Sequence, residues 1–206
     1  TFLEPFNPRQ GENFEPVPGF HEGSAWNYTF YVPHDIMGLA KLMGGRKAFV
    51  SRLQKVFDEG LYDPANEPDI AYPYLFSYFK GEEWRTQKTV HELLEKYYTT
   101  RPNGLPGNDD TGTMSAWAIF SMMGFYPDCP GKAEYTLTSP RFDRIEIKLA
   151  PEYCEGENKL VIKCSRTSGE GWKKIGSVKL SGKTLPSLRV SHKDLVKGGL
   201  LEFRCL

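Results

Sequence analysis

The strongest constraint on the fold is a change in the spacing of apolar residues partway along the sequence. Between residues 34 and 125 apolar side chains recur every three or four positions, which places them on one face of an α-helix. After SPRFD (residues 139–143) they recur at every second position, as in a strand with one buried face. The sequence therefore predicts an α+β chain, in which helices come first and an antiparallel β module follows.

The first part of the chain contains two amphipathic helical segments. Residues 46–60 (RKAFVSRLQKVFDEG) and 86–100 (TQKTVHELLEKYYTT) each place apolar side chains on a single face. Shorter helices are expected at residues 34–45 and 71–79, and a last helix begins near Thr111. Apolar, aromatic and small side chains follow one stripe of that last helix, which predicts that it packs on several sides.

The second part of the chain is predicted to form strands. Residues 145–149 alternate Ile or Leu with charged side chains, and Leu160 and Ile162 are likewise spaced two positions apart. The composition changes near residues 128–140, and we place the domain boundary there. The predicted domains are a helical portion at 1–127 and an antiparallel β module at 128–206.

Charge and hydropathy argue against several classes of function. The 26 basic residues balance the 26 acidic ones, so no field of one sign favours nucleic acid or an anionic membrane as a partner. No apolar run reaches the roughly 18 to 20 residues that a membrane-spanning helix needs. The chain begins at Thr1 with a proline-rich stretch and no signal-peptide pattern, so we expect a fragment or processed product of a longer protein.

The four cysteines all lie in the second part of the chain, at Cys129, Cys154, Cys164 and Cys205. None belongs to a CxxC pair or stands at zinc-ligand spacing from a histidine, which argues against a zinc site. Disulfides in an exported protein and free buried thiols both agree with this pattern. Four cysteines allow three pairings, so the sequence leaves the pairing open.

Three loop stretches of the helical portion place carboxylates beside Gly, Asn or Trp. They are HEGSAWNYTFYVPHD (21–35), ANEPDIAYPYLF (65–76) and GNDDTG (107–112). In the third stretch, Asp109 and Asp110 stand at the mouth of the last helix. An acid in the position of Asp110 can be an N-cap, or it can be a base that the helix dipole keeps ionised in an enclosed pocket.

Glu22 and the NEPD segment suggest further chemistry. Aromatic residues follow Glu22 closely, so we expect its carboxyl group to lose hydration and to favour the protonated form that a general acid needs. A solvated loop glutamate is the alternative. Asn66, Glu67 and Asp69 offer the hard oxygen donors that calcium selects, although they lack the EF-hand spacing.

Taken in order, these three stretches and the following SPRFDRIEI resemble family 92 of the glycoside hydrolases, the calcium-dependent exo-acting α-mannosidases. The C-terminal SVKLSGKTL and VSHKDLVKGGLLEF also look similar to that family, so the resemblance covers nearly the whole chain. It implies part of an (α/α)6 helical toroid followed by the small β module. It also implies hydrolysis of terminal α-mannosidic bonds in mannose-containing glycans, as in N-glycan processing, by a single displacement that inverts the anomeric carbon.

The resemblance also implies roles for individual residues. Glu22, in the E-G-x-x-W motif, would be the general acid, and Asp110, the last acid of the G-N-x-D-x-G motif, would be the base that activates water. Asp109 would assist or hold the loop. Asn66 and Glu67 match the calcium-binding N-E-P of the family, so Ca²⁺ is the expected cofactor.

The expected contacts with the sugar come from residues near these acids and from aromatic rings. Trp26 and Trp84 are candidates for stacking on a sugar, with core packing as the alternative for each. His21 and Asn108 are the other candidates for substrate binding, although structural hydrogen bonding is the alternative for His21. Asp69 and Ile70 depart from the Ser-His that relatives often carry there, which puts the substrate contacts of that loop in question.

Relatives in this family are several times longer and are exported, so we expect an extracellular or periplasmic location. The resemblance implies that this chain packs against a missing N-terminal domain of the same enzyme and has little activity alone. Asn27 begins a formal glycosylation sequon, and its place in the E-G-x-x-W stretch predicts that it is unoccupied. A non-catalytic carbohydrate-binding module, a structural fragment and a different helical-toroid glycosidase are the alternatives.

Overall fold

A computed structural model describes residues 7–11, 15, 19–154, 156–168 and 171–206 of the chain. Much of the proline-rich stretch predicted to be extended, residues 1–20, lies outside the described residues. The helical part contains α-helices joined by loops and short 3-10 helices. In chain order the elements are α1 (Ala25–Thr29), α2 (Ile36–Leu42), α3 (Arg46–Asp58), η2 (Glu67–Asp69), η3 (Tyr72–Tyr78), α4 (Glu83–Tyr97), η4 (Asp110–Gly112) and α5 (Thr113–Met123).

Two sheets follow the helices. Their elements are β1 (Phe125–Tyr126), β2 (Glu134–Leu137), β3 (Arg144–Lys148), β4 (Lys159–Arg166), β5 (Ile175–Leu180), β6 (Lys183–Thr184), β7 (Arg189–Ser191), α6 (His192–Leu195) and β8 (Gly199–Cys205). The smaller sheet has the order β1-β2-β7, and the larger has the order β3-β4-β8-β5-β6.

The prediction of an antiparallel module is correct for every pair of strands except one. β4 and β8 run parallel, with Leu160 opposite Gly199 and Arg166 opposite Cys205. Parallel neighbours need a long connection, and here the chain forms β5, β6, β7 and α6 before it returns as β8. The larger sheet is therefore mixed.

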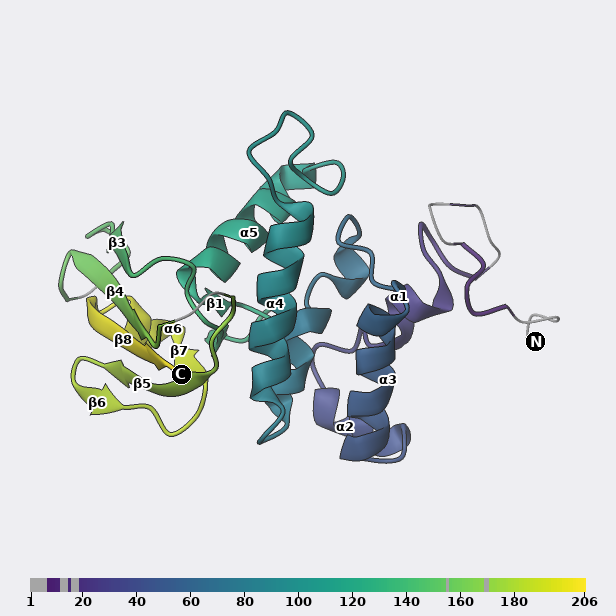
Figure 1. The fold of residues 1–206 in the computed structure, drawn as a ribbon, viewed down its shortest axis with the longest axis horizontal. Coiled ribbons are helices and arrows are strands. Elements are labelled where there is room, and N and C mark those ends of the chain that lie inside the picture. Colours follow the sequence, from purple (N-terminus) through teal and green to yellow (C-terminus); the bar gives the residue numbers. More distant parts are fainter. Residues whose placement is uncertain (1–6, 12–14, 16–18, 155, 169–170) are drawn as a thin grey trace.

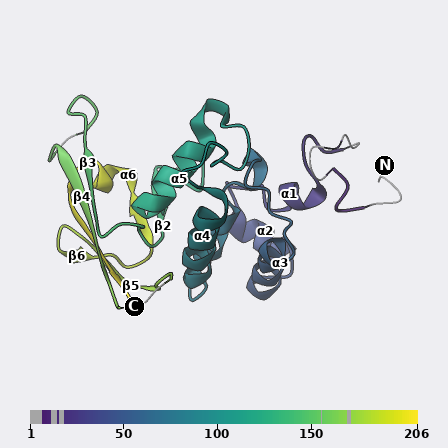
Figure 2. The ribbon, with the colours of Figure 1, turned by 45° about the horizontal axis from the view of Figure 1, so that its top comes forward.

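The sheets lie at one end of the molecule and helices α1 to α3 at the other, with α4 and α5 between them (Figure 1). Figure 2 shows the same order from a second direction. One cluster of buried apolar side chains belongs to the helices and a second belongs to the sheets. β1 precedes residue 128 and pairs with β2, so strand pairing begins before the predicted boundary. The division into domains 1–127 and 128–206 stays a prediction.

The two amphipathic helices are confirmed as α3 and α4. Their inward faces are fully or largely buried, as the spacing of apolar residues predicts. The segment at 71–79 forms the 3-10 helix η3 instead of an α-helix; it has a proline in its first turn, and most of its side chains are buried. A helix that is buried on most sides has no amphipathic pattern from which its period could be read.

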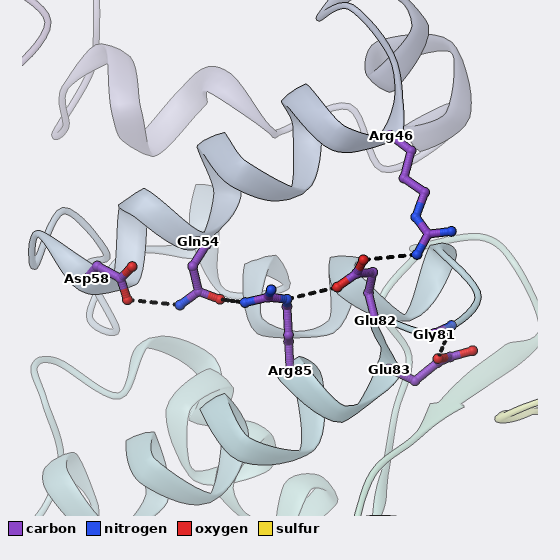
Figure 3. Close-up of polar contacts among 7 residues, drawn as sticks. All are labelled: Arg46, Gln54, Asp58, Gly81, Glu82, Glu83 and Arg85. Carbon is purple, nitrogen blue, oxygen red and sulfur yellow. Dashed lines mark hydrogen bonds and ion pairs between the residues drawn. The ribbon is translucent and has the colours of Figure 1, made fainter.

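A chain of polar contacts joins α3 to the start of α4 (Figure 3). Arg46 and Arg85 each bind Glu82, with nitrogen–oxygen distances of 2.9 Å. Arg85 also donates to Gln54 at 2.7 Å, and Gln54 donates in turn to Asp58. These contacts fix the two helices at the rim of their shared apolar core.

The helical and sheet parts are joined through a partly buried ionic contact. Asp128 is 1% exposed and accepts a hydrogen bond from the Thr136 hydroxyl group. A guanidinium nitrogen of Arg189, on β7, lies 3.7 Å from a carboxylate oxygen of Asp128. The same guanidinium group binds Glu134 at 3.1 Å and lies 4.2 Å from the ring centre of Tyr78, on η3. Charge, hydrogen bonding and ring contact thus link η3 to the smaller sheet.

Candidate active site

Glu22 lies in the turn that leads into α1. Its backbone has a φ of 51°, in the left-handed region that side-chain-bearing residues rarely adopt. The side-chain amide of Asn66 donates a hydrogen bond to the Glu22 backbone carbonyl. The Glu22 carboxylate is 57% exposed and lies 3.6 Å from the imidazole of His21. The backbone of this acid is therefore held more firmly than its side chain.

The expected loss of hydration at Glu22 is not found in this chain. Two of the aromatic residues that follow it turn towards the helical core: Phe30 is 1% exposed, and Trp26 packs against the core cluster. Tyr28 donates its hydroxyl hydrogen to the His21 carbonyl and so supports the turn instead of covering the acid. The prediction was wrong because neighbours in sequence need not surround the same side chain.

A buried hydrogen-bond network lies behind this turn. The Asn27 side-chain oxygen accepts from the Ser24 backbone N–H at 2.8 Å and from the Ser24 hydroxyl at 2.9 Å. The Asn27 side-chain nitrogen donates to Asp69 at 2.9 Å. Asn27 is only 4% exposed, and both ends of its side-chain amide are hydrogen-bonded. In the folded chain the side-chain nitrogen of this sequon is therefore not accessible for glycosylation.

Asp69 lies wholly inside the protein. One carboxyl oxygen accepts from the Asn27 side chain and from the Asp63 backbone N–H, each at 2.9 Å. The other oxygen has no hydrogen-bond partner among the described residues. Burial raises the pKa of Asp69 to about 8, although its hydrogen bonds act in the opposite direction. Of the three oxygen donors noted in the NEPD segment, Asp69 therefore faces the protein interior.

Asn66 and Glu67 remain the candidate calcium ligands. Asn66 is 5% exposed and uses its amide nitrogen on Glu22, a contact that does not involve its amide oxygen. Glu67 begins η2 and is exposed. Calcium takes about six to eight oxygen ligands, so these two adjacent donors match a calcium site in kind and are too few to complete one. The described residues contain no group of three or more His, Cys, Asp or Glu side chains placed to hold a metal.

The two adjacent acids before α5 do different work. The Asp109 carboxylate accepts from the backbone N–H groups of Met114 and Ser115, at 2.9 and 3.0 Å, and from the Ser115 hydroxyl. These bonds, chiefly those from Ser115, lower the pKa of Asp109. Asp109 thus binds the free amide groups at the helix start, the task that the N-cap interpretation gives to Asp110.

Asp110 is exposed, and in the described part of the chain only its backbone carbonyl makes hydrogen bonds, accepting from Thr113 at 2.6 Å and from Thr111 at 2.7 Å. Thr111 has a φ of 53°, so the backbone reverses sharply directly after the acid. The Asp110 carboxylate is accessible to a ligand.

The structure brings the three acidic stretches into contact. A Cβ atom built on Gly107 would lie only 2.7 Å from the Cβ of Ala65, so the GNDDTG loop packs closely on the residue before Asn66. Asn66 binds the Glu22 backbone, as described above. The Trp117 indole of α5 also donates to the Ile70 carbonyl at 3.0 Å. The NEPD stretch therefore lies between the other two and contacts both.

The expected sugar-binding residues occupy different surroundings. His21 and Asn108 are exposed within the first and third acidic stretches. Trp26 packs on the helical core, and the Lys55 ammonium group lies 5.4 Å from its ring centre. Trp84 stacks with Trp172 from the sheet part, with ring centres 6.3 Å apart. Both indoles thus make packing contacts, and the structure does not join Trp84 to the acidic stretches.

Two residues of this region, Asn27 and Asp69, have a role that sequence reasoning missed. A Ser three positions before Asn27 is the local signal of a reciprocal cap at a helix start. The Asn27–Asp69 contact spans 42 positions, and nothing in the local sequence announces it.

Two exposed carboxylates, on loops that both contact the NEPD stretch and its hard oxygen donors, are groups of the kind that glycoside hydrolases use in catalysis. The family description "Glycosyl hydrolase family 92 catalytic domain" matches residues 1–205. The chain therefore belongs to glycoside hydrolase family 92, and the resemblance stated from its motifs is confirmed.

Individual relatives agree with this assignment. Over 182 residues the chain is 31% identical to an uncharacterized secreted glycosidase of Arthroderma benhamiae, a match that covers 88% of this chain and 23% of the relative. A family GH92 α-mannosidase from Bacteroides thetaiotaomicron, solved in complex with mannoimidazole, aligns with a TM-score of 0.86 and 27% identity. That match covers 99% of this chain and 28% of the α-mannosidase.

A family GH92 inverting mannosidase from the same species aligns with a TM-score of 0.82 and 28% identity, over 100% of this chain and 29% of that one. The α+β fold, helices followed by two sheets, is thus confirmed as part of the GH92 α-mannosidase fold. The chain spans less than a third of the length of these relatives. In the part of the chain that the structure describes, no helix is long and apolar enough to cross a membrane.

Proposed function

We propose that this chain supplies the general acid, the base and part of the calcium site of a longer exo-acting α-mannosidase that inverts the anomeric carbon. The observation that carries the proposal is the contact of all three acidic stretches: Asn66 binds the backbone of Glu22, and Gly107 packs on Ala65. That contact places Glu22 and the loop of Asp110 on either side of one short segment.

In this mechanism Glu22 and Asp110 have opposite protonation states. The protonated Glu22 carboxyl group gives its proton to the glycosidic oxygen as the bond to the anomeric carbon breaks. The Asp110 carboxylate takes a proton from the water that attacks the opposite face of that carbon. Inverting pairs stand roughly 6.5 to 9.5 Å apart so that this water fits between them.

Asp109 would hold the base in place. Its three hydrogen bonds with the start of α5 anchor the loop, so the backbone turns at Thr111 with Asp110 directed to solvent. This division of labour assigns anchoring to Asp109 and water activation to Asp110.

Asn66 and Glu67 would hold the calcium ion through their side-chain oxygens. When bound, calcium binds neighbouring hydroxyl groups of a sugar and favours ring distortion towards an oxocarbenium-like state. His21 and Asn108, exposed beside the two acids, are the proposed polar contacts with terminal mannose of a glycan. Packing of this chain against an N-terminal domain of the same enzyme and an exported location complete the proposal, and the name of the Arthroderma relative supports the location.

The test uses the full-length parent enzyme with an α-mannobiose and an aryl α-mannoside. Wild-type enzyme should release mannose with inverted configuration, followed by NMR, and should lose activity in a chelator and regain it with Ca²⁺. Glu22→Gln and Asp110→Asn should each lower kcat by about 100-fold or more, because general acid–base catalysis contributes roughly 10²–10⁴-fold.

Two results would contradict the proposal. Full turnover by Asp110→Asn would show that Asp110 is not the catalytic base. Saccharide binding without turnover by the wild-type parent would favour a carbohydrate-binding module. The isolated 206-residue chain is expected to have little activity, so it serves as the companion sample.

A further inference from the structure

Two buried side chains behind the Glu22 turn, Asn27 and Asp69, have no part in the mechanism above. Asn27 connects two segments of the chain, because its side-chain oxygen binds Ser24 and its side-chain nitrogen binds Asp69. Ser24 stands two positions after Glu22, and Asp69 stands three positions after Asn66. The network therefore bridges the turn of the proposed acid and the loop of the proposed metal ligands.

Stability alone gives a poor account of Asp69. Its side chain is 0% exposed, and one oxygen has no partner among the described residues. A buried carboxyl group with an unsatisfied oxygen is unfavourable relative to an apolar or smaller group in the same place. A buried polar group of this kind calls for an explanation, and one of the two bonds that Asp69 accepts comes from Asn27, which in turn holds the Glu22 turn at Ser24.

The Glu22 turn needs such support. Its φ of 51° is unfavourable for glutamate, and the carboxylate itself is more than half exposed, so little side-chain packing positions it. The turn is held from its backbone on two sides, by Asn66 at the Glu22 carbonyl and by Asn27 at the Ser24 N–H. A Cβ atom on the intervening Gly23 would lie 3.3 Å from atoms of both amides, which shows how closely they enclose the turn.

We infer that Asn27 and Asp69 are positioning residues that hold the Glu22 turn against the Asn66 loop and so aim the general acid at the glycosidic oxygen. This inference rests on the proposed function. To hold the turn, Asp69 must accept hydrogen bonds from the Asn27 side chain and the Asp63 backbone N–H. Asparagine can accept both through its side-chain oxygen, so Asp69→Asn should preserve the turn, whereas Asp69→Ala and Asn27→Ala should release it.

The kinetic test compares two leaving groups in the full-length parent. A 2,4-dinitrophenyl α-mannoside needs little protonation, and an α-mannobiose needs much. Releasing the turn should lower kcat on the α-mannobiose by about 10-fold or more, since misplacement of about 1 Å can cost 10²-fold. The loss on the dinitrophenyl substrate should be several-fold smaller, as for Glu22→Gln, and Asp69→Asn should restore the wild-type ratio of the two rates.

Gln87→Ala is the matched control, because Gln87 is also buried and holds a distant backbone N–H, that of Ile175, at 2.8 Å. It should leave the ratio of the two rates unchanged. Equal losses on both substrates in Asn27→Ala and Asp69→Ala, or wild-type rates in both, would overturn the inference.

A second measurement does not depend on catalysis. Amide hydrogen exchange at Ser24 should accelerate in Asn27→Ala and Asp69→Ala and stay slow in Asp69→Asn and Gln87→Ala. Unchanged exchange at Ser24 in both alanine variants would overturn the inference even in an active enzyme. If the wild-type parent cleaves neither mannoside, the proposed function fails, and the exchange data separately report whether the network holds the turn.

Discussion

The contact between Asp128 and Arg189 offers the sharpest test of the interior of the smaller sheet, where Arg189 also meets Tyr78 of η3. Asp128 Oδ2 and Arg189 Nη2 are both buried, neither has a hydrogen-bond partner among the described residues, and they face each other at 3.7 Å. Asp128 therefore depends on the charge of Arg189, whereas Arg189 also pairs with Glu134. Removing one member should leave the other as a buried and poorly compensated ion.

The magnitude follows from what remains after each change. Breaking a buried ion pair costs about 3–5 kcal/mol. Arg189→Met keeps an apolar stem beside Tyr78 but leaves Asp128, bonded to the Thr136 hydroxyl, without a neighbouring cation, so we expect a loss of about 3 kcal/mol in unfolding free energy. Asp128→Asn should cost about 2 kcal/mol, because Arg189 still has Glu134 at 3.1 Å.

The double variant makes the argument testable. With both charges gone no uncompensated ion remains, so its loss should fall about 2 kcal/mol short of the sum of the single losses. Urea unfolding followed by circular dichroism, with Asp143→Asn as an exposed control on the sheet part, measures all four variants. Additive losses, with a coupling below about 0.5 kcal/mol, would refute the idea that each group is buried for the other.

Two further predictions concern titration and thiol chemistry. Hydrogen bonds from Arg85 and then Arg46 lower the pKa of Glu82, so its contribution is present above the ordinary glutamate pKa and is lost as pH falls through the lowered value. Unfolding experiments should therefore show wild type more stable than Glu82→Gln at pH 7, by about 1 kcal/mol, with the gap closing below about pH 4; a constant gap would contradict this. In a thiol-labelling assay the partly exposed Cys129 and Cys154 should react in the native state. The buried Cys164 and Cys205, whose sulfur atoms lie 3.5 Å apart, should react only after unfolding, and equal labelling rates for the two pairs would contradict this.

The spacing of apolar residues predicted most of the fold, because burial acts at the level of single elements. Helix α3 begins at Arg46, where the amphipathic pattern begins, and the alternation at 145–149 became β3. Helix α4 begins at Glu83, three residues before the predicted start at Thr86. The prediction missed this first turn because Glu83 and Trp84 lie outside the apolar stripe of the helix. An element edge depends on capping and contacts that the pattern does not contain.

The pairing of strands could not be predicted in the same way. Alternation shows which face of a strand is buried, and it is the same whether the neighbouring strand is parallel or antiparallel. The parallel contact of β4 with β8 depends on how the chain returns after α6, which is a property of the whole second part. The local pattern therefore predicted the strands but not that β4 and β8 run parallel.

The candidate site divides along the same line. Glu22, Asp110, Asn66 and Glu67 were identified because each stands in a short motif, and the structure brings those motifs together through Asn66 and Gly107. The surroundings of each acid could not be predicted from the sequence: Glu22 is open to solvent where loss of hydration was expected, and nothing in the NEPD segment indicated that Asp69 is buried. Contacts between residues more than 40 positions apart decide both.

These surroundings indicate how the site achieves its geometry with exposed acids. The carboxylates of Glu22 and Asp110 have few contacts of their own, and each is instead placed by a backbone turn of positive φ, at Glu22 and at Thr111. Each turn is fixed by a neighbouring polar side chain: Asn66 for the first and Asp109 for the second. With polar supports behind exposed side chains, the loops set the position of the acids and leave the carboxyl groups open to solvent. Substitutions behind the turns should therefore lower kcat without touching the acids, by about 10-fold where loss of an acid costs about 100-fold.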